Sequence, residues 1–154
     1  MPTAAFIDTN ILLYAASDGR LEPVKTRLAR RLLRHRPWAV SMQVVQEFQV
    51  NATRKVALGI SSRHAAEVVD GLLERAVVDT TRELFLQAVV LQNRFMLHYS
   101  DAAICQAAIQ AGYRLLFSED MTSEEVYDRV MVLNPFDQGG RWIEEDPTRL
   151  QRME

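Results

Sequence analysis

Short, uninterrupted apolar runs alternate along the chain with longer segments in which apolar positions recur at helical spacing. Uninterrupted runs are typical of strands that are buried on both faces of a parallel sheet. These runs predict strands at residues 4–7, 38–40, 77–78, 115–117 and 130–133.

The longer segments have the periodicity of amphipathic helices. After Pro23, for example, Val24, Leu28 and Leu32 fall on one helical face while arginines fall on another. The pattern predicts helices at residues 10–16, 23–36, 42–58, 62–75, 81–96 and 100–111.

Polar residues ahead of these segments mark where helices begin. Ser41 and Ser100 are candidate N-cap residues. The pairs at 80/83 and 122/125 are Thr followed three residues later by Glu, which is the capping-box pattern. We therefore expect a helix to start at each of these four places.

Strands that alternate with helices in this way indicate an α/β fold with three α/β/α layers around a mainly parallel central sheet. The length of 154 residues fits one compact domain. We expect this domain to span residues 1–136. Residues 137–154 contain Gly139, Gly140 and Pro147, and we expect them to form a loosely ordered tail.

Composition excludes several classes of protein. The chain is 48% hydrophobic and 25% charged, which is ordinary for a globular domain. No apolar run has the length of a membrane span, and no basic residue precedes the first apolar stretch as in a signal peptide. Cys105 stands alone, which excludes an internal disulfide and a cysteine metal cluster. We expect a cytoplasmic protein.

The net charge of −2 hides an uneven distribution of charge. Seven of the 18 lysines and arginines lie between Arg20 and Arg36, where Glu22 is the only acid. One face of the predicted helix carries Arg27, Arg30, Arg31 and Arg34. Such a face can follow RNA phosphates, but it is also an ordinary solvated surface, and the sequence leaves both interpretations open.

Three carboxylates lie at or near predicted strand ends or helix starts, Asp8, Asp101 and Asp120, and a fourth, Glu47, lies inside the predicted helix that follows residues 38–40. The carboxyl ends of parallel strands meet at one edge of a sheet, where ligands bind, so we expect these side chains to converge. Each also has a structural interpretation, as a helix cap, a partner of a helix dipole, a turn residue or a partner of an arginine.

The surroundings of these acids favour a metal. Lys and Arg are absent from residues 1–19 and 95–113, so no equal set of cations accompanies the acids. Converging carboxylates repel one another, and a divalent cation relieves that repulsion. All-oxygen ligands favour Mg²⁺ or Mn²⁺ over zinc. Metal held in this way activates water and stabilises charge on phosphate, so phosphodiester hydrolysis is the predicted reaction.

Four stretches resemble, in the same order, the motifs of PIN-domain proteins. They are Phe-Ile-Asp-Thr-Asn-Ile-Leu-Leu-Tyr at 6–14, the segment 41–48, Tyr-Ser-Asp-Ala at 99–102 and Leu-Phe-Ser-Glu-Asp-Met at 116–121. The resemblance covers roughly residues 4–136. It extends to VapC-type toxins of type II toxin–antitoxin pairs, and it implies a Mg²⁺- or Mn²⁺-dependent endoribonuclease.

The resemblance also implies roles for individual residues. Asp8, Asp101 and Asp120 would hold the metal directly or through water, and Glu47 would complete the acidic cluster and orient water. Asn10 and Ser118 would be supporting polar groups. Glu119 adjoins Asp120, and the motif favours Asp120 as the residue that faces the metal. The implied partners are an RNA substrate, a cognate antitoxin and a second copy in a homodimer.

Three other functions fit the sequence. The first is a PIN-fold module that binds RNA or protein without catalysis. The second is a phosphatase with Asp8 as nucleophile, similar to haloacid-dehalogenase-like enzymes, although Asn10 stands where their second aspartate supplies the general acid. The third is an RNA-binding protein that acts through the arginine face.

Overall fold

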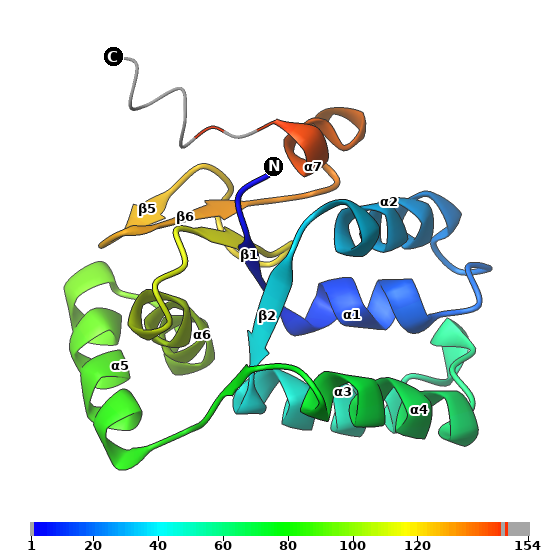
Figure 1. Cartoon of the computed structure of the whole chain (residues 1–154), viewed down its shortest axis with the longest axis horizontal. Helices are drawn as coiled ribbons and strands as arrows, with labels where there is room; N and C mark the ends of the chain where they lie inside the picture. The colour runs from blue at the N-terminus through cyan, green and yellow to red at the C-terminus, as the bar shows by residue number, and fades with distance from the viewer. Residues whose placement is uncertain (1, 146, 148–154) are drawn as a thin grey trace.

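Six strands form one sheet at the centre of the computed structural model, which describes residues 2–145 and 147 (Figure 1). The order across the sheet is β3-β2-β1-β4-β6-β5, and all neighbours are parallel except β5 and β6. The strands are β1 (Ala5–Ile7), β2 (Trp38–Ser41), β3 (Val77–Val78), β4 (Leu115–Phe117), β5 (Val126–Tyr127) and β6 (Val130–Leu133). The predicted α/β class with a mainly parallel sheet is confirmed.

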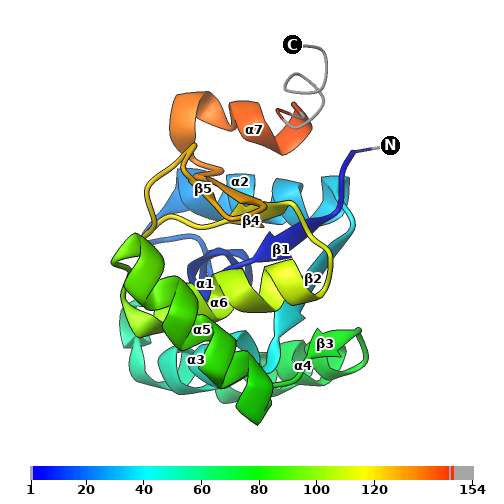
Figure 2. The same ribbon diagram turned by 90° about the vertical axis from the view of Figure 1, so that its left-hand side faces the viewer.

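Helices cover both faces of this sheet. Helices α1 and α2 pack together on one side of the central strands, and α5 and α6 pack together on the other (Figures 1 and 2). Helix α3 packs against both α1 and α4. The helices are α1 (Thr9–Ala16), α2 (Pro23–His35), α3 (Met42–Arg54), α4 (Ser62–Leu73), α5 (Arg82–Phe95), α6 (Tyr99–Gln110) and α7 (Arg141–Glu144).

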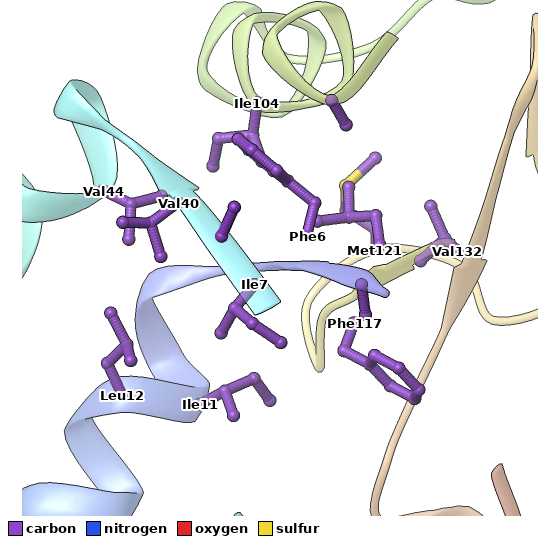
Figure 3. Close-up of a cluster of buried hydrophobic side chains, with 14 of the residues drawn as sticks. Phe6, Ile7, Ile11, Leu12, Val40, Val44, Ile104, Phe117, Met121 and Val132 are labelled. Atoms are coloured by element: carbon purple, nitrogen blue, oxygen red, sulfur yellow. The ribbon is translucent and has the colours of Figure 1, made fainter. Parts of the chain in front are cut away.

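Strand β1, at the centre of the sheet, is buried on both faces because its side chains alternate between two helical layers. Phe6 points toward Ile104 of α6, whereas Ile7 points toward Ile11 of α1 (Figure 3). All four side chains are at most 2% exposed. This double burial explains why the strand is an uninterrupted apolar run in the sequence.

The helix start predicted at Thr122–Glu125 is wrong. The segment leads instead into β5, in which Val126 pairs with Met131 of the neighbouring strand. Glu124 and Asp128 have left-handed backbone angles, φ 69° and 57°, which turn the chain around β5. As an edge strand, the segment forms backbone hydrogen bonds with β6. A short helix here would have no apolar stripe to pack against the domain.

Two other helix starts shift by one or two residues. The side chain of Thr81, not Thr80, accepts the capping hydrogen bond, from the backbone N–H of Leu84. Helix α6 begins at Tyr99 after His98, which makes no side-chain cap, so Ser100 lies inside the first turn. By contrast, the predicted cap at Ser41 is present and accepts from Val44.

Helices α3 and α4 differ from the prediction in detail. Helix α3 ends at Arg54, and a separate 3-10 turn, Val56–Leu58, precedes Gly59. Gly59 has φ +66°, and an added Cβ would meet the carboxylate of Asp18, so glycine is required there. On α4, the apolar side chain of Leu73 is 51% exposed.

The C-terminal segment is more ordered than predicted as far as Glu145. Residues 137–139 form a 3-10 turn, and Trp142 and Ile143 of α7 are buried, 5% and 0% exposed. These two apolar side chains attach the segment to the domain, whereas the neighbouring glycines suggested a loose tail. Residues 146 and 148–154 of the predicted tail lie outside the described residues. No helix in the described part of the chain has the length and apolar character needed to cross a membrane.

Candidate acidic site

The site lies at the carboxyl ends of β1 and β4, two parallel neighbours in the middle of the sheet. Asp8 follows β1 and Ser118 follows β4. The strand order reverses at this point: the chain continues from β1 to β2 and β3 on one flank, and β4 then lies on the other flank of β1. Parallel α/β sheets bind ligands at such a switch point, as the sequence predicted.

Asp8 is the most buried acid of the group, with 5% of its surface exposed. One carboxylate oxygen accepts from the backbone N–H of Thr9 at 2.7 Å, and the other accepts from the Ser118 hydroxyl at 2.7 Å. The pKa of Asp8 is raised to about 6: burial is the largest cause, the two hydrogen bonds oppose it, and the charges of Glu47 and Asp120 add to the rise. The carboxylate is therefore held in one orientation in an electrostatically unfavourable place.

The turn after β4 brings Asp120 to the same place. The hydroxyl of Ser118 accepts long hydrogen bonds from the backbone N–H groups of Asp120 and Met121, 3.3 and 3.4 Å. Asn10 donates its side-chain amide to the Asp120 carboxylate at 3.0 Å. The amide oxygen of Asn10 is buried and has no hydrogen-bond partner among the described residues. It is an acceptor turned inward at the edge of the acidic group without a donor.

Glu47 projects from α3 and is held by two side chains. Thr9 donates its hydroxyl to one carboxylate oxygen at 2.6 Å, and Gln43 donates to the other at 2.9 Å. Gln43 also donates to the backbone carbonyl of Ser100 at 3.2 Å, which connects α3 to α6. The sequence analysis missed Thr9 and Gln43. The available signal was the four-residue spacing of Gln43 and Glu47 on one helix face.

Asp101 completes the group from the first turn of α6 and is half-buried. Burial raises its pKa, His98 opposes that rise, and the charges of Asp120 and Glu47 add to it. Cys105 lies one turn further along α6, where burial and the charges of Asp101 and Asp8 raise the thiol pKa to about 12. The charges of Glu47 and Asp120 thus act on both Asp8 and Asp101, which connects the four predicted acids electrostatically.

Glu119 is turned away from this group. One of its carboxylate oxygens accepts from the Tyr14 hydroxyl at 2.8 Å, and the other forms an ion pair with Lys25 at 2.8 Å. The geometry therefore places Asp120, rather than Glu119, with the other acids, as the motif favoured.

The donor set fits a hydrated magnesium or manganese ion better than a protein cage. Among residues 2–145 and 147, no three His, Cys, Asp or Glu side chains are grouped closely enough to hold a metal between them. Mg²⁺ usually keeps several waters and binds one or two carboxylates directly. Mutually repelling carboxylates and the unpartnered amide oxygen of Asn10 suit such an ion.

The four arginines of the predicted face differ in the contacts that they make. Arg30 donates to the carbonyls of Ala15 and Ser17, at the end of α1. Arg31 forms an ion pair with Glu144 of α7. Arg27, Arg30 and Arg34 are all exposed and line a cavity of about 280 Å³.

Comparison with known proteins gives one family match. The sequence profile of the PIN domain matches residues 5–128. No curated protein matches the chain.

Several solved structures share the fold. A chain of a toxin–antitoxin complex from Klebsiella pneumoniae has TM-score 0.65 and 21% identity, over 86% of this chain and 98% of that one. Mycobacterium tuberculosis VapC20, described as a toxin that cleaves the sarcin-ricin loop, has TM-score 0.60 and 20% identity, over 75% and 91%. A chain of VapBC2 from Rickettsia felis, solved with promoter DNA, has TM-score 0.58 and 16% identity, over 86% and 98%. At these identities the likeness shows the fold alone.

Proposed function

The chain belongs to the PIN-domain family, and we propose from its acidic site that it is a Mg²⁺- or Mn²⁺-dependent endoribonuclease, the toxin of a type II toxin–antitoxin pair. One observation carries the proposal: at the switch point of the sheet, the charges of Glu47 and Asp120 act on the buried carboxyls of both Asp8 and Asp101. Among the described residues, no Lys or Arg forms an ion pair with any of them. Such a group gains stability from a divalent cation.

The roles of the side chains follow from their contacts. Asp8, Asp101 and Asp120 would hold the ion, directly or through water, and the free amide oxygen of Asn10 would accept from a bound water. Ser118 keeps Asp8 in its rotamer through the 2.7 Å hydrogen bond. Glu47, fixed by two donors, is suited to orient a water molecule. A divalent ion bound here would lower the pKa of a water and stabilise charge on the scissile phosphate.

The proposed partners are RNA, an antitoxin and a second copy of the chain, and the proposed place of action is the cytoplasm. Two of the similar structures are toxin–antitoxin complexes, which supports the antitoxin. An apolar strip of α5 supports self-association: Phe85, Leu86 and Val90 are 47%, 55% and 61% exposed. A monomer at all concentrations in size-exclusion chromatography with light scattering would exclude the homodimer.

The phosphatase alternative fits the geometry poorly. Both carboxylate oxygens of Asp8 are occupied by hydrogen bonds, and the side chain is 5% exposed, so it is badly placed to attack a phosphate. Asn10 cannot act as the general acid. A binding module without catalysis is therefore the second candidate, because it would keep the same fold.

Thermal melting with EDTA, then Mg²⁺ or Mn²⁺, tests the metal site. Binding to the native state alone stabilises the wild type by about 2.7 kcal/mol at a metal concentration near 100 times the dissociation constant. Asp8→Asn should lose that stabilisation, whereas the control Asp70→Asn, exposed on α4, should retain it.

Cleavage of RNA tests the activity itself. Asp8→Asn, Glu47→Gln and Asp101→Asn should each lower the cleavage rate by about 100-fold or more and leave the fold intact. Metal binding without cleavage of any RNA, or no melting shift with either metal at millimolar concentration, would favour the binding module.

A further inference from the structure

Two side chains of helix α1 bind the consecutive acids Glu119 and Asp120 and turn them in different directions. Asn10 and Tyr14 lie four residues apart, on one face of the helix. Asn10 donates to Asp120 at 3.0 Å, and Tyr14 donates to Glu119 at 2.8 Å. One helix face therefore directs Asp120 toward the acidic site and Glu119 away from it.

Helix α2 provides the second anchor for Glu119. Lys25, in its first turn, forms an ion pair with Glu119 at 2.8 Å. Its ammonium group lies over the rings of Tyr14 and Phe136, 5.4 and 5.7 Å from their centroids. These two rings pack edge to face at 5.4 Å, so the ammonium is held on an aromatic platform.

The contacts of Glu119 with Tyr14 and Lys25 both lie outside the acidic site. The direct bond to Glu119 raises the pKa of Lys25. Burial and then Glu119 raise the pKa of Tyr14. Both partners stay protonated at neutral pH, so the charge of Glu119 is balanced locally and adds no fifth carboxylate to the site.

We propose that Lys25, Tyr14 and Glu119 form a positioning unit for Asp120, which holds the turn after β4 so that Asp120, and not its neighbour, faces the metal. The proposal rests on the metal-dependent function above. The backbone N–H of Asp120 bonds to Ser118 on one side, and Glu119 is fastened to two helices on the other. When the lysine is removed, Glu119 is free to compete for the site and Asp120 can move away from it.

A purely structural clamp would have the same contacts but different consequences. The side chains of Lys25 and Glu119 are only 32% and 22% exposed, so loss of Lys25 should lower the melting temperature in either case. Only a positioning unit should also affect metal affinity, and only while Asp120 is present to be positioned.

The experiment is a double-mutant cycle of Lys25→Met and Asp120→Asn, read by Mn²⁺ titration with electron paramagnetic resonance. Outer-sphere partners of metal sites typically change affinity by about 10- to 100-fold, so Lys25→Met should weaken Mn²⁺ binding by about 10-fold. Lys25→Arg should restore binding. In the Asp120→Asn background, Lys25→Met should have no further effect. Arg63→Met, which removes an exposed ion pair on α4, is the matched control.

A second readout does not depend on metal. The side-chain amide signals of Asn10 in NMR spectra report its bond to Asp120, and Lys25→Met should shift them toward their positions in Asp120→Asn. Unchanged signals would overturn the positioning role. Equal weakening of Mn²⁺ binding in both backgrounds would also overturn it. If the wild type binds no Mn²⁺ but the signals shift as expected, the proposed function fails and the positioning of Asp120 stands.

Discussion

Two buried charged centres lie beyond opposite ends of the central strands. Beyond the amino ends, Arg36 is 3% exposed and donates to the backbone carbonyls of Thr3, Trp142, Ile143 and Glu145 at 2.6–3.0 Å. Its guanidinium also lies 5.5 Å from the centroid of the Phe117 ring. Beyond the carboxyl ends, Asp8 is similarly buried, but the nearby charges have its own sign.

The difference separates a structural charge from a functional one. A buried charge that is surrounded by matched donors or acceptors fixes the local packing and needs nothing more. A buried charge that is surrounded by like charges destabilises the fold until a ligand neutralises it. Removal of the charge should therefore have opposite effects at the two centres.

The largest effect is expected at Arg36. Arg36→Met removes four hydrogen bonds and leaves buried carbonyls without donors, so we expect a loss of about 3–5 kcal/mol in the free energy of unfolding. Urea denaturation measures it. Arg63→Met, whose ion pair is exposed, should change stability by less than about 0.5 kcal/mol. A similarly small loss for Arg36→Met would show that its hydrogen bonds are not structural.

Asp8→Asn should increase the free energy of unfolding of the metal-free protein, the opposite of the effect expected for Arg36→Met. The folded-state pKa of Asp8, about 6, lies above the ordinary 3.8, so the folded state binds the proton more tightly than the unfolded state. The associated stability is complete below about pH 3.8 and is lost as the pH rises through 6. The full loss is about 3 kcal/mol. At pH 7, Asp8→Asn should therefore be more stable than the wild type by about 2 kcal/mol, because the amide forms weaker hydrogen bonds than the carboxylate.

Denaturation in EDTA at pH 4 and pH 7 checks this prediction. The gain should be near zero at pH 4 and present at pH 7, and Asp70→Asn serves as the control for loss of an exposed acid. A gain that is equal at both pH values would mean that the charge of Asp8 is not its cause.

The sequence predicted well those elements whose pattern is compatible with only one kind of secondary structure. Residues 5–7 and 115–117 are short apolar runs between helices, and they became the two central strands. Asp8 and Asp120 lie just beyond the carboxyl ends of these two strands. The local rule and the overall fold agree at these places, so local reasoning was sufficient.

The failures occur where tertiary contacts decide. Thr122 and Glu125 have a capping pattern, but pairing with β6 made the segment after them a strand. The polar and glycine-rich segment around 137–145 docks through Trp142 and Ile143 onto a surface that Arg36 completes. Thr9 acquires its role only because α1 and α3 meet at Glu47, 38 residues along the chain. Arg36 and Ile143 are 107 residues apart. Gln43, by contrast, lies four residues before Glu47 on the same helix.

The smallest effect on stability is expected on the arginine face. Here too, an arginine that binds backbone carbonyls can be compared with arginines that do not. Arg30 resembles Arg36, since it donates to two carbonyls at the end of α1. Arg30→Gln should therefore cost about 1 kcal/mol. Arg27→Gln and Arg34→Gln should cost less than about 0.5 kcal/mol, because both side chains are exposed and, unlike Arg30, bind no backbone carbonyl among the described residues.

For RNA binding we expect the reverse order, with larger effects for Arg27 and Arg34 than for Arg30. If the exposed arginines contact phosphates, each of Arg27→Gln and Arg34→Gln should lower the slope of log affinity against log salt by about 1. Fluorescence anisotropy with the inactive Asp8→Asn protein and a labelled single-stranded RNA measures that slope without cleavage. Because Arg30 is occupied by α1, Arg30→Gln should leave the slope unchanged. An equal change for all three variants would mean that the contacts of Arg30 with α1 do not set it apart from its neighbours.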